Sequence, residues 1–253
     1  MANLQGREAI AVISDIHSNR PALEAVLRDI GERGVRRIVC LGDSLFGPID
    51  PLGTARLLMD EPRLVHLMGN CDEVLIRPEG AGPTYNYVKP LLTGEIARWM
   101  SDFPAVWTDG DWLFCHGTPD ANYVYLLEEV GPNGASYKPL ERLRRELAHV
   151  HARLVICGHS HVFAARKLPD GKLVLNAGSV GLPAYEDDEP LPHRMASGTP
   201  YAEYAIVSEG SAEGGGDPQI EHRLVPYDWE EAAELALRRG RTDYATAVRT
   251  GFI

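Results

Sequence analysis

The segment RLVICGHSH, residues 153–161, joins a short apolar run to two histidines that follow it directly. The run is rich in β-branched residues, and its apolar side chains are continuous rather than alternating. This pattern indicates a strand that is buried on both faces. Gly158 allows the chain to turn sharply where the strand ends. Because two imidazoles at positions i and i+2 rarely follow a buried strand by accident, His159 and His161 are candidates for a binding site.

Similar apolar runs recur along the chain and are predicted to be strands, at residues 9–14, 37–41, 63–68, 112–115 and 172–175. Helical patterns lie between them, at residues 21–34, 84–103 and 137–152. Pro21 suits the first turn of a helix and Gly34 suits its end. Strands that alternate with helices predict an α/β fold.

The last third of the chain has a different pattern. Residues 201–210 and 218–228 are predicted to be two antiparallel strands, joined by a Gly-rich loop tip, SAEGGGD. A helix is expected over 228–240, with Asp228 as its N-cap. Residues 183–200 are interpreted as a long acidic, proline-rich loop that is either a lid or disordered. No repeat or linker interrupts the chain, which predicts a single domain over residues 1–253.

The composition excludes several classes of protein. Hydrophobic residues make up 44% and charged residues 24%, which is typical of a globular protein. No apolar run approaches the roughly 18 residues of a membrane span, and the N-terminus lacks a signal-peptide pattern. We therefore expect a cytoplasmic protein without membrane contact. The net charge of −11 disfavours stable nucleic-acid binding, but bound cations would still allow a phosphate-bearing substrate.

Polar residues follow the ends of most predicted strands. In open α/β sheets, ligands bind outside the carboxyl ends of the strands. Two carboxylates, four imidazoles and an amide are expected at that edge, and together they suit zinc, iron, manganese or nickel. These residues are Asp15, His17, Asp43, Asn70, His116, His159 and His161.

Structural roles are the alternative for single members of this set. Asp15 alone could cap a helix, Asp43 could belong to a turn, and His116 could be a buried, hydrogen-bonded histidine. Ser179 follows a predicted strand, but no base is placed for a serine-hydrolase triad. No role is assigned to the other five histidines, which are His66, His149, His151, His193 and His222.

Six ordered motifs resemble those of the calcineurin-like metallophosphoesterases. They are SDIHSN (14–19), LGD (41–43), GNCD (69–72), CHG (115–117), GHSH (158–161) and NAGSVG (176–181). The resemblance implies two facing mixed β-sheets flanked by helices, a four-layer αββα sandwich. It also implies two divalent metal ions at the strand ends, for which manganese, iron, nickel and zinc are all candidates.

The resemblance further implies a role for each matching residue. Asp15, His17 and His161 would hold one metal. Asn70, His116 and His159 would hold the other, and Asp43 would bridge both. Two cations roughly 3.5–4 Å apart can clamp a phosphoryl oxygen and lower the pKa of bound water towards about 7. The implied reaction is in-line attack of a metal-bound hydroxide on a small phosphate ester.

The GNCD motif departs from the pattern of many relatives, which carry a histidine directly after the asparagine. That histidine is proposed to protonate the leaving oxygen, whereas this chain has Cys71. The resemblance is closest to a subgroup with cysteine here, several members of which act as phosphodiesterases. Asn70 and Cys71 are thus the candidate catalytic residues.

Cys71 is a poor replacement for an imidazolium acid, because a thiol has a pKa of about 8.5. Loss of a general acid typically costs about 10²–10⁴-fold in rate, so diesters with good leaving groups are expected to be preferred. A nucleophilic thiolate is the less favoured alternative. Asp72 would either cap the following turn or hydrogen-bond a metal ligand.

Two alternative functions remain from the sequence. The loop GDSLFGPIDP (42–51) loosely resembles relatives that cleave dinucleoside polyphosphates or other pyrophosphate-type anhydrides. A non-catalytic scaffold is disfavoured, because such proteins usually lose metal ligands and all seven positions are filled here. Candidate walls of a substrate site are residues 44–57, 78–103 and 183–200, with Tyr123 and Tyr125.

Overall fold

The structure is a computed structural model that describes residues 8–210 and 216–253. The N-terminal residues 1–7 and most of the predicted loop tip, 211–215, lie outside the described residues.

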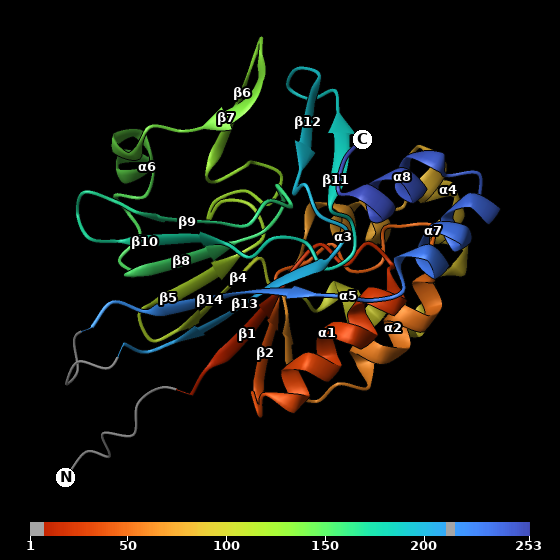
Figure 1. Cartoon of the computed structure of the whole chain (residues 1–253), viewed down its shortest axis with the longest axis horizontal. Coiled ribbons are helices and arrows are strands. Elements are labelled where there is room, and N and C mark those ends of the chain that lie inside the picture. The colour runs from red at the N-terminus through yellow and green to blue at the C-terminus, as the bar shows by residue number, and fades with distance from the viewer. Residues whose placement is uncertain (1–7, 211–215) are drawn as a thin grey trace.

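Two five-stranded mixed sheets form the centre of the molecule (Figure 1). The first has the order β14-β13-β1-β2-β3, and the second has the order β4-β5-β8-β10-β9. In the first sheet β1, β2 and β3 pair in parallel, and in the second sheet β5, β8 and β10 do. The other pairings in both sheets are antiparallel. The first sheet consists of β1 (Ile10–Ile13), β2 (Arg37–Cys40), β3 (Leu64–His66), β13 (Ala202–Ser208) and β14 (Gln219–Val225). The second consists of β4 (Val106–Asp109), β5 (Trp112–Cys115), β8 (Leu154–Cys157), β9 (Ala164–Lys167) and β10 (Leu173–Asn176).

The continuous apolar runs are explained by burial on both faces of the first sheet. Along β1, Ile10 and Val12 pack into the cluster between the two sheets, with Trp112 and Phe114 of the second sheet. Ala11 and Ile13 belong to the other large cluster, beneath the helices. Because successive side chains point to opposite faces of a sheet, both sets must be apolar.

Helices cover the outer face of each sheet, which confirms the predicted α/β class with mixed sheets flanked by helices (Figure 1). The first sheet is covered by α1 (Arg20–Glu32), α2 (Pro51–Met59), α3 (Asn70–Ile76), α4 (Pro83–Val88) and α5 (Gly94–Ser101). A short 3-10 turn, η1 (Lys89–Leu91), joins α4 to the stretch before α5. On the second sheet lies α6 (Leu140–Glu146).

The helix expected over 137–152 is shorter than predicted. Tyr137 instead ends β7 (Gly134–Tyr137), which pairs with β6 (Glu128–Gly131) in a hairpin. Pro139 takes the N-cap position of α6. Pro139 is itself extended, with a ψ of 139°, and a proline disfavours the helical conformation of the residue before it, so the helix begins only after Pro139.

Residues 183–200 are not an irregular loop, and that prediction is wrong. They contain a hairpin of β11 (Ala184–Asp187) and β12 (His193–Ala196). In β12, His193 and Met195 are buried and alternate with exposed residues. This period of two outweighs the acidic and proline-rich composition.

The C-terminal helices form a further layer beside α1. The helix α7 (Trp229–Arg238) begins as predicted, with the Asp228 side chain accepting from the Glu231 amide. A second helix, α8 (Thr242–Thr250), was not predicted and lies against β11. Both helices share one apolar cluster with Leu182 and Ala184. The hairpin β11–β12 is thereby joined to the C-terminal helices.

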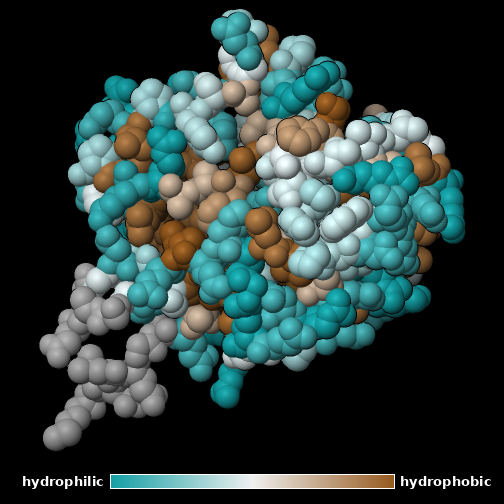
Figure 2. All heavy atoms as spheres, in the orientation of Figure 1, coloured by the Kyte–Doolittle hydropathy of each residue, from teal (hydrophilic) through white to brown (hydrophobic). Residues whose placement is uncertain are grey.

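No helix in the described part of the chain is long and apolar enough to cross a membrane. On the face shown in Figure 2, hydrophilic residues form most of the rim, and apolar residues gather in smaller groups towards the middle.

Candidate dimetal centre

The loops that follow β1, β2 and β10 are hydrogen-bonded to one another through their backbones. The Asp15 amide donates to the Gly42 carbonyl over 3.0 Å, and the His17 amide donates to the Asp43 carbonyl over 2.9 Å. The Gly181 amide donates to the Asp15 carbonyl over 3.0 Å. Parallel strands bring their carboxyl ends to one edge, and these bonds then fix the loops there.

The backbone at this edge is strained. Among residues 8–210 and 216–253, six non-glycine residues have positive φ angles. They are Asp15 (55°), His17 (46°), Ser18 (59°), Asp43 (57°), His159 (69°) and His161 (61°), and five of these are predicted metal ligands. Such conformations cost about 1–3 kcal/mol each and concentrate at functional sites. The strain therefore marks the same residues that the motifs selected.

The glycines of LGD and GNCD allow the two loops to touch. A Cβ atom at Gly69 would lie 2.1 Å from Asp43 Oδ1. At Gly42, with a φ of 120°, it would lie 2.4 Å from the Gly69 nitrogen. Only glycine fits at either position without moving Asp43 or its neighbours.

The first cluster consists of Asp15, His17 and His161, with one possible ligand atom from each within 4.8 Å of the others. Nδ1 of His17 lies 2.7 Å from the Phe46 carbonyl, and Nδ1 of His161 lies 2.5 Å from the Leu182 carbonyl. Each Nδ1 therefore carries a proton, because a carbonyl only accepts. The two Nε2 atoms face each other at 3.2 Å.

With Nδ1 of each ring bonded to a carbonyl, Nε2 is the atom that each neutral imidazole can offer to a metal ion. Asp15 Oδ1 lies 3.2 Å from His161 Nε2 and is buried without a hydrogen-bond partner among the described residues. Burial raises the pKa of Asp15, but His161 and His116 outweigh it and lower the pKa to about 2. An unsatisfied carboxylate oxygen beside two imidazole lone pairs fits a divalent cation.

The second cluster consists of Asp43, His116 and His159. Nδ1 of His116 lies 3.1 Å from the Leu41 carbonyl, so Nε2 points into the site. It lies 3.0 Å from Asn70 Oδ1 and 3.5 Å from Asp43 Oδ2. Asp43 Oδ2 also lies 3.7 Å from His17 Nε2 of the first cluster. One carboxylate oxygen thus stands between both clusters.

The charges at the second cluster favour a cation. Burial lowers the pKa of His116, but the carboxylates of Asp43 and Asp15 outweigh it and raise the pKa to about 9. Burial, followed by the neighbouring His116, lowers the pKa of His159 to about 3. The site thus already attracts positive charge, which a metal ion can supply in place of a proton.

The structure brings all seven predicted ligands to one edge. Asn70 is the first residue of α3, and the Cys71 amide donates to Asp43 Oδ1 over 2.9 Å. Burial and the Asp43 carboxylate raise the pKa of the Cys71 thiol well above its usual value. Burial and the neighbouring carboxylate thus disfavour the thiolate that the nucleophilic alternative requires.

Asp72 performs both of the roles that the sequence left open. Its carboxylate accepts from the amide of Gly69 over 3.2 Å, which caps α3. It also accepts from the amides of Asp43 over 2.7 Å and Ser44 over 2.9 Å. Asp72 therefore fixes the loop that carries Asp43. Burial and the Asp43 charge raise the pKa of Asp72 to about 7.

The loop GHSH is supported by Asn176 of the NAGSVG motif and by Glu128, which the sequence did not single out. The Ser160 hydroxyl donates to Glu128 Oε1 over 3.1 Å, and Asn176 Nδ2 donates to Ser160 Oγ over 2.9 Å. Asn176 also donates to the Gly158 carbonyl over 2.6 Å. Burial raises the pKa of Glu128 to about 7. Ser179 supports Asp15 instead of acting in a triad, because its hydroxyl donates to the Asp15 carbonyl.

Two tyrosines from the surrounding segments cover the histidines. The Tyr125 ring lies 4.7 Å from the His159 ring, and the Tyr185 ring lies 4.5 Å from that of His161, measured between centroids. Their hydroxyls are 2.6 Å apart, and Tyr185 donates to the His159 carbonyl over 2.9 Å.

His193 extends this row of hydrogen bonds, with Nε2 at 2.9 Å from the Tyr125 hydroxyl. It was assigned to a loop without a role, but it lies in β12 and anchors the hairpin to the site. The period-two pattern of HRMA was the signal that could have revealed it. His66 stacks on Phe103 and His222 on Phe163, away from both clusters.

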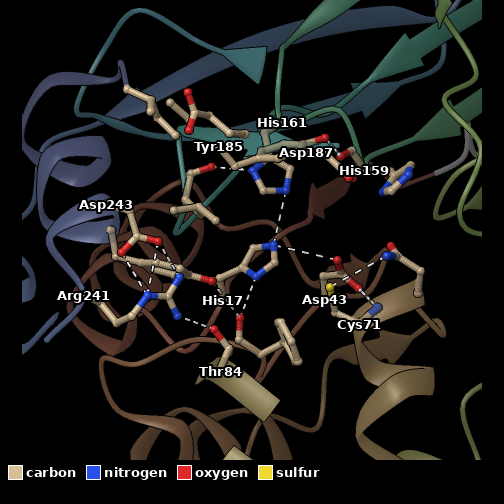
Figure 3. A pocket seen from close by; sticks show the side chains of 17 residues that line it. His17, Asp43, Cys71, Thr84, His159, His161, Tyr185, Asp187, Arg241 and Asp243 are labelled. Atoms are coloured by element: carbon tan, nitrogen blue, oxygen red, sulfur yellow. Dashed lines mark hydrogen bonds and ion pairs between the residues drawn. The ribbon is translucent and has the colours of Figure 1, made fainter. Parts of the chain in front are cut away.

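A cavity of about 440 Å³ opens beside the two clusters (Figure 3). Three of the predicted wall segments contribute to it, through Phe46, Thr84 and Tyr185. Tyr123 does not line the cavity, and 71% of it is exposed to solvent. Tyr125 lies behind His159 rather than in the wall.

A further wall, not predicted from the sequence, is formed by Arg241, Asp243, Tyr244 and Ile253. The spacing of the buried residues Tyr244, Ala247 and Val248 is helical, and Gly251 adopts the left-handed conformation that ends many helices. These were the signals that could have predicted α8.

Comparisons with known proteins agree with this geometry. The profile of the calcineurin-like phosphoesterase superfamily domain matches residues 9–193. An uncharacterized protein of Methanocaldococcus jannaschii is 28% identical over 250 residues, which cover 92% of this chain and 93% of that protein.

Two solved structures share the fold. The crystal structure of a metallophosphoesterase from Sphaerobacter thermophilus has a TM-score of 0.74 at 23% identity and covers 96% of this chain and 99% of its own. A hypothetical protein from Pyrococcus horikoshii OT3 has a TM-score of 0.69 at 17% identity, with 97% and 99% covered.

Proposed function

Because this chain belongs to the calcineurin-like phosphoesterase superfamily and is a metal-dependent phosphoester hydrolase, we propose that it acts on small phosphodiesters. The observation that carries the proposal is the position of Asp43 Oδ2, within 3.5–3.7 Å of an imidazole nitrogen from each cluster. A single carboxylate oxygen in this position is suited to join two metal ions into one reaction centre.

The proposed ligand sets follow the two clusters. Asp15, His17 and His161 would hold one ion. Asn70, His116 and His159 would hold the other, with Asp43 shared between them. When bound, two divalent cations stabilise charge on a phosphoryl oxygen and activate water at neutral pH.

The protein itself fixes the ligands before any ion arrives. Backbone carbonyls of Phe46, Leu182 and Leu41 each accept from the Nδ1 of one imidazole and orient its Nε2 towards the site. Asp72 holds Asp43 from behind. Such supporting hydrogen bonds reduce the reorganisation that substrate binding would otherwise require.

Cys71 carries the preference for diesters. It occupies the position after Asn70 and lines the cavity, where a thiol provides no imidazolium to protonate the leaving oxygen. Leaving groups that depart without a proton, such as aryl or nucleotide oxygens, are then favoured. The cavity also offers apolar walls from Phe46, Leu182 and Tyr244 for a second ester substituent.

The test compares bis(p-nitrophenyl) phosphate with p-nitrophenyl phosphate, with Mn²⁺, Ni²⁺, Zn²⁺, Mg²⁺ or EDTA. We expect faster cleavage of the diester with at least one metal and no cleavage with EDTA. Preference for the monoester would contradict the diester proposal. Absence of metal-dependent cleavage of either ester would favour an anhydride substrate or a scaffold.

A substitution tests the role of Cys71 directly. Cys71→His should raise monoester cleavage relative to diester cleavage, because it restores an imidazole next to the leaving oxygen. Cys71→Ser is the matched control, since a hydroxyl of similar size adds no general acid at neutral pH. An equal change in both variants would show that removal of the thiol, rather than the added imidazole, alters the preference.

A further inference from the structure

The cavity wall formed by Arg241, Asp243, Tyr244 and Ile253 contains a cation. Arg241 precedes α8 and lines the cavity together with Asp243 and Tyr244. Among the described residues that line this cavity, it is the only arginine or lysine. Figure 3 shows Arg241 and Asp243 on one side of His17, with Asp43 and Cys71 on the other. The arginine thus faces the cavity at a position separate from the candidate metal clusters.

The guanidinium is held in place from three directions. Its Nε donates to Asp243 over 2.9 Å, its Nη2 donates to Asp243 over 2.5 Å, and its Nη1 donates to the Thr84 hydroxyl. Its plane lies over the Tyr244 ring, with Cζ 4.4 Å from the ring centroid. Only 18% of the side chain is exposed. A rotamer-rich side chain is therefore already ordered before any ligand binds.

Arginine has five N–H donors, and these contacts use three of them. The paired donors of Nε and Nη2 hold one carboxylate, that of Asp243, and Tyr244 is a further partner of the guanidinium. Two N–H groups on one guanidinium match the oxygens of a phosphate in a bidentate arrangement. A purely structural tether between α8 and Thr84 would not need a position on the cavity wall.

Carboxylates line the cavity around this arginine. Glu186, Asp187 and Asp243 also line the cavity. An anionic substrate would be repelled by these carboxylates outside the metal clusters, unless a cation received its remote part. Asp243 is half-exposed at its side chain, so a phosphate could displace it from the guanidinium towards solvent.

We propose that Arg241 binds a second phosphate group of the substrate, remote from the phosphorus that reacts at the metal clusters. This inference rests on the proposed phosphodiesterase function and adds the substrate class, which is a phosphodiester with a further phosphate. The second group could be a terminal monoester phosphate or the continuation of a polyphosphate chain. Both present the same oxygens to a guanidinium.

A matched pair of substrates tests the proposal. The p-nitrophenyl ester of thymidine 5′-phosphate carries one phosphate, and its 3′-phosphorylated form carries a second with the same leaving group. We expect kcat/KM to be higher for the second substrate. The ratio of kcat/KM for the 3′-phosphorylated ester to kcat/KM for the unphosphorylated ester should fall by about tenfold or more in Arg241→Gln. This is the range for hydrogen bonds to charged groups. A dinucleoside triphosphate, whose cleavage is followed by chromatography, tests a polyphosphate chain as the source of the second phosphate.

Three controls separate an effect on binding from an effect on folding. Arg238→Gln removes an exposed arginine of α7 that pairs with Glu234 and should leave the ratio as in the wild type. Thermal unfolding of Arg241→Gln shows whether α8 stays attached. Arg241→Lys keeps the charge but not the fork and should restore part of the ratio.

The outcomes are distinct. A selective loss in Arg241→Gln with the 3′-phosphorylated ester supports a terminal phosphate, and a selective loss with the triphosphate supports a chain. Equal losses on all substrates would overturn the inference, although metal-dependent diester cleavage would leave the proposed function intact. If the wild type cleaved none of these substrates with any metal, the proposed function itself would fail.

Discussion

The metal-cluster edge and the opposite cavity wall are built in different ways. At the edge, each predicted ligand follows a strand within a few residues, and the backbone is strained at five of the seven positions. The lining of the cavity on the other side of His17 includes Thr84, Tyr185 and Arg241, which come from three segments far apart in the chain. Strand order alone places the first region, whereas the second depends on how helices and a hairpin pack around it.

The difference shows how a phosphoesterase fold can keep one reaction and change its substrate. The ligands are tied to parallel strands and to each other, so their arrangement tolerates little variation. The wall is attached through one apolar cluster and a few hydrogen bonds. Substitutions at the edge should therefore affect the reaction with every substrate, whereas those in the wall should affect only some.

The largest effect is expected at the shared carboxylate. Asp43→Asn should reduce metal-dependent kcat/KM by about 10³-fold or more, because a neutral amide cannot balance two cations. Metal content measured by mass spectrometry should fall from two ions per chain. The control Asp170→Asn changes an exposed carboxylate of a turn. Retention of two ions and full activity in Asp43→Asn would refute the shared role.

A smaller loss is expected for the residue behind Asp43. Asp72→Asn replaces a carboxylate that accepts three backbone bonds with an amide that has one acceptor oxygen. We expect activity or metal affinity to fall by about 10- to 100-fold, as is typical for supporting residues. A titration with metal should show weaker binding, and saturating metal should restore part of kcat. If only thermal stability changed, Asp72 would merely cap α3.

The pH dependence of stability tests the role of Glu128, which accepts a hydrogen bond from Ser160 of the GHSH loop. Burial raises its pKa from 4.5 to about 7, so the folded protein holds a proton that the unfolded chain releases. This contribution to stability is present at low pH and is lost as the pH rises towards 7. Glu128→Gln removes the charge, so its stability relative to wild type should increase by roughly 2 kcal/mol from pH 5 to pH 7. Urea unfolding of both proteins at the two pH values measures this difference in stability. A difference that stays the same at pH 5 and pH 7 would contradict the prediction.

The smallest effect is expected where the hairpin meets the edge. Tyr185→Phe removes a hydroxyl that donates to the His159 carbonyl and contacts Tyr125. The loss should be about 1 kcal/mol of stability and only a modest change in kcat. Tyr123→Phe is the matched control, since Tyr123 is largely exposed. A loss as large as that of Asp72→Asn would mean that the hairpin belongs to the edge rather than to the wall.

Local signals explain which parts were predictable. The strands β1, β2, β5, β8 and β10 agree with their apolar runs within one or two residues. Asp228 caps α7 as predicted, because capping depends on neighbours in the sequence. The hairpin β11–β12 was hidden by its acidic composition, and α8 was overlooked although its spacing was helical.

The sequence by itself determined the fold class and the seven residues that meet at the strand ends. Both follow from local order, because each ligand is adjacent to a buried strand and parallel strands share an edge. The tertiary structure decided that Asp72 supports Asp43, that Tyr125, Tyr185 and His193 join the hairpin to the histidines, and that Arg241 faces the cavity. These contacts join residues far apart in the chain, such as Arg241 and Thr84 at 157 positions, and no local spacing encodes them.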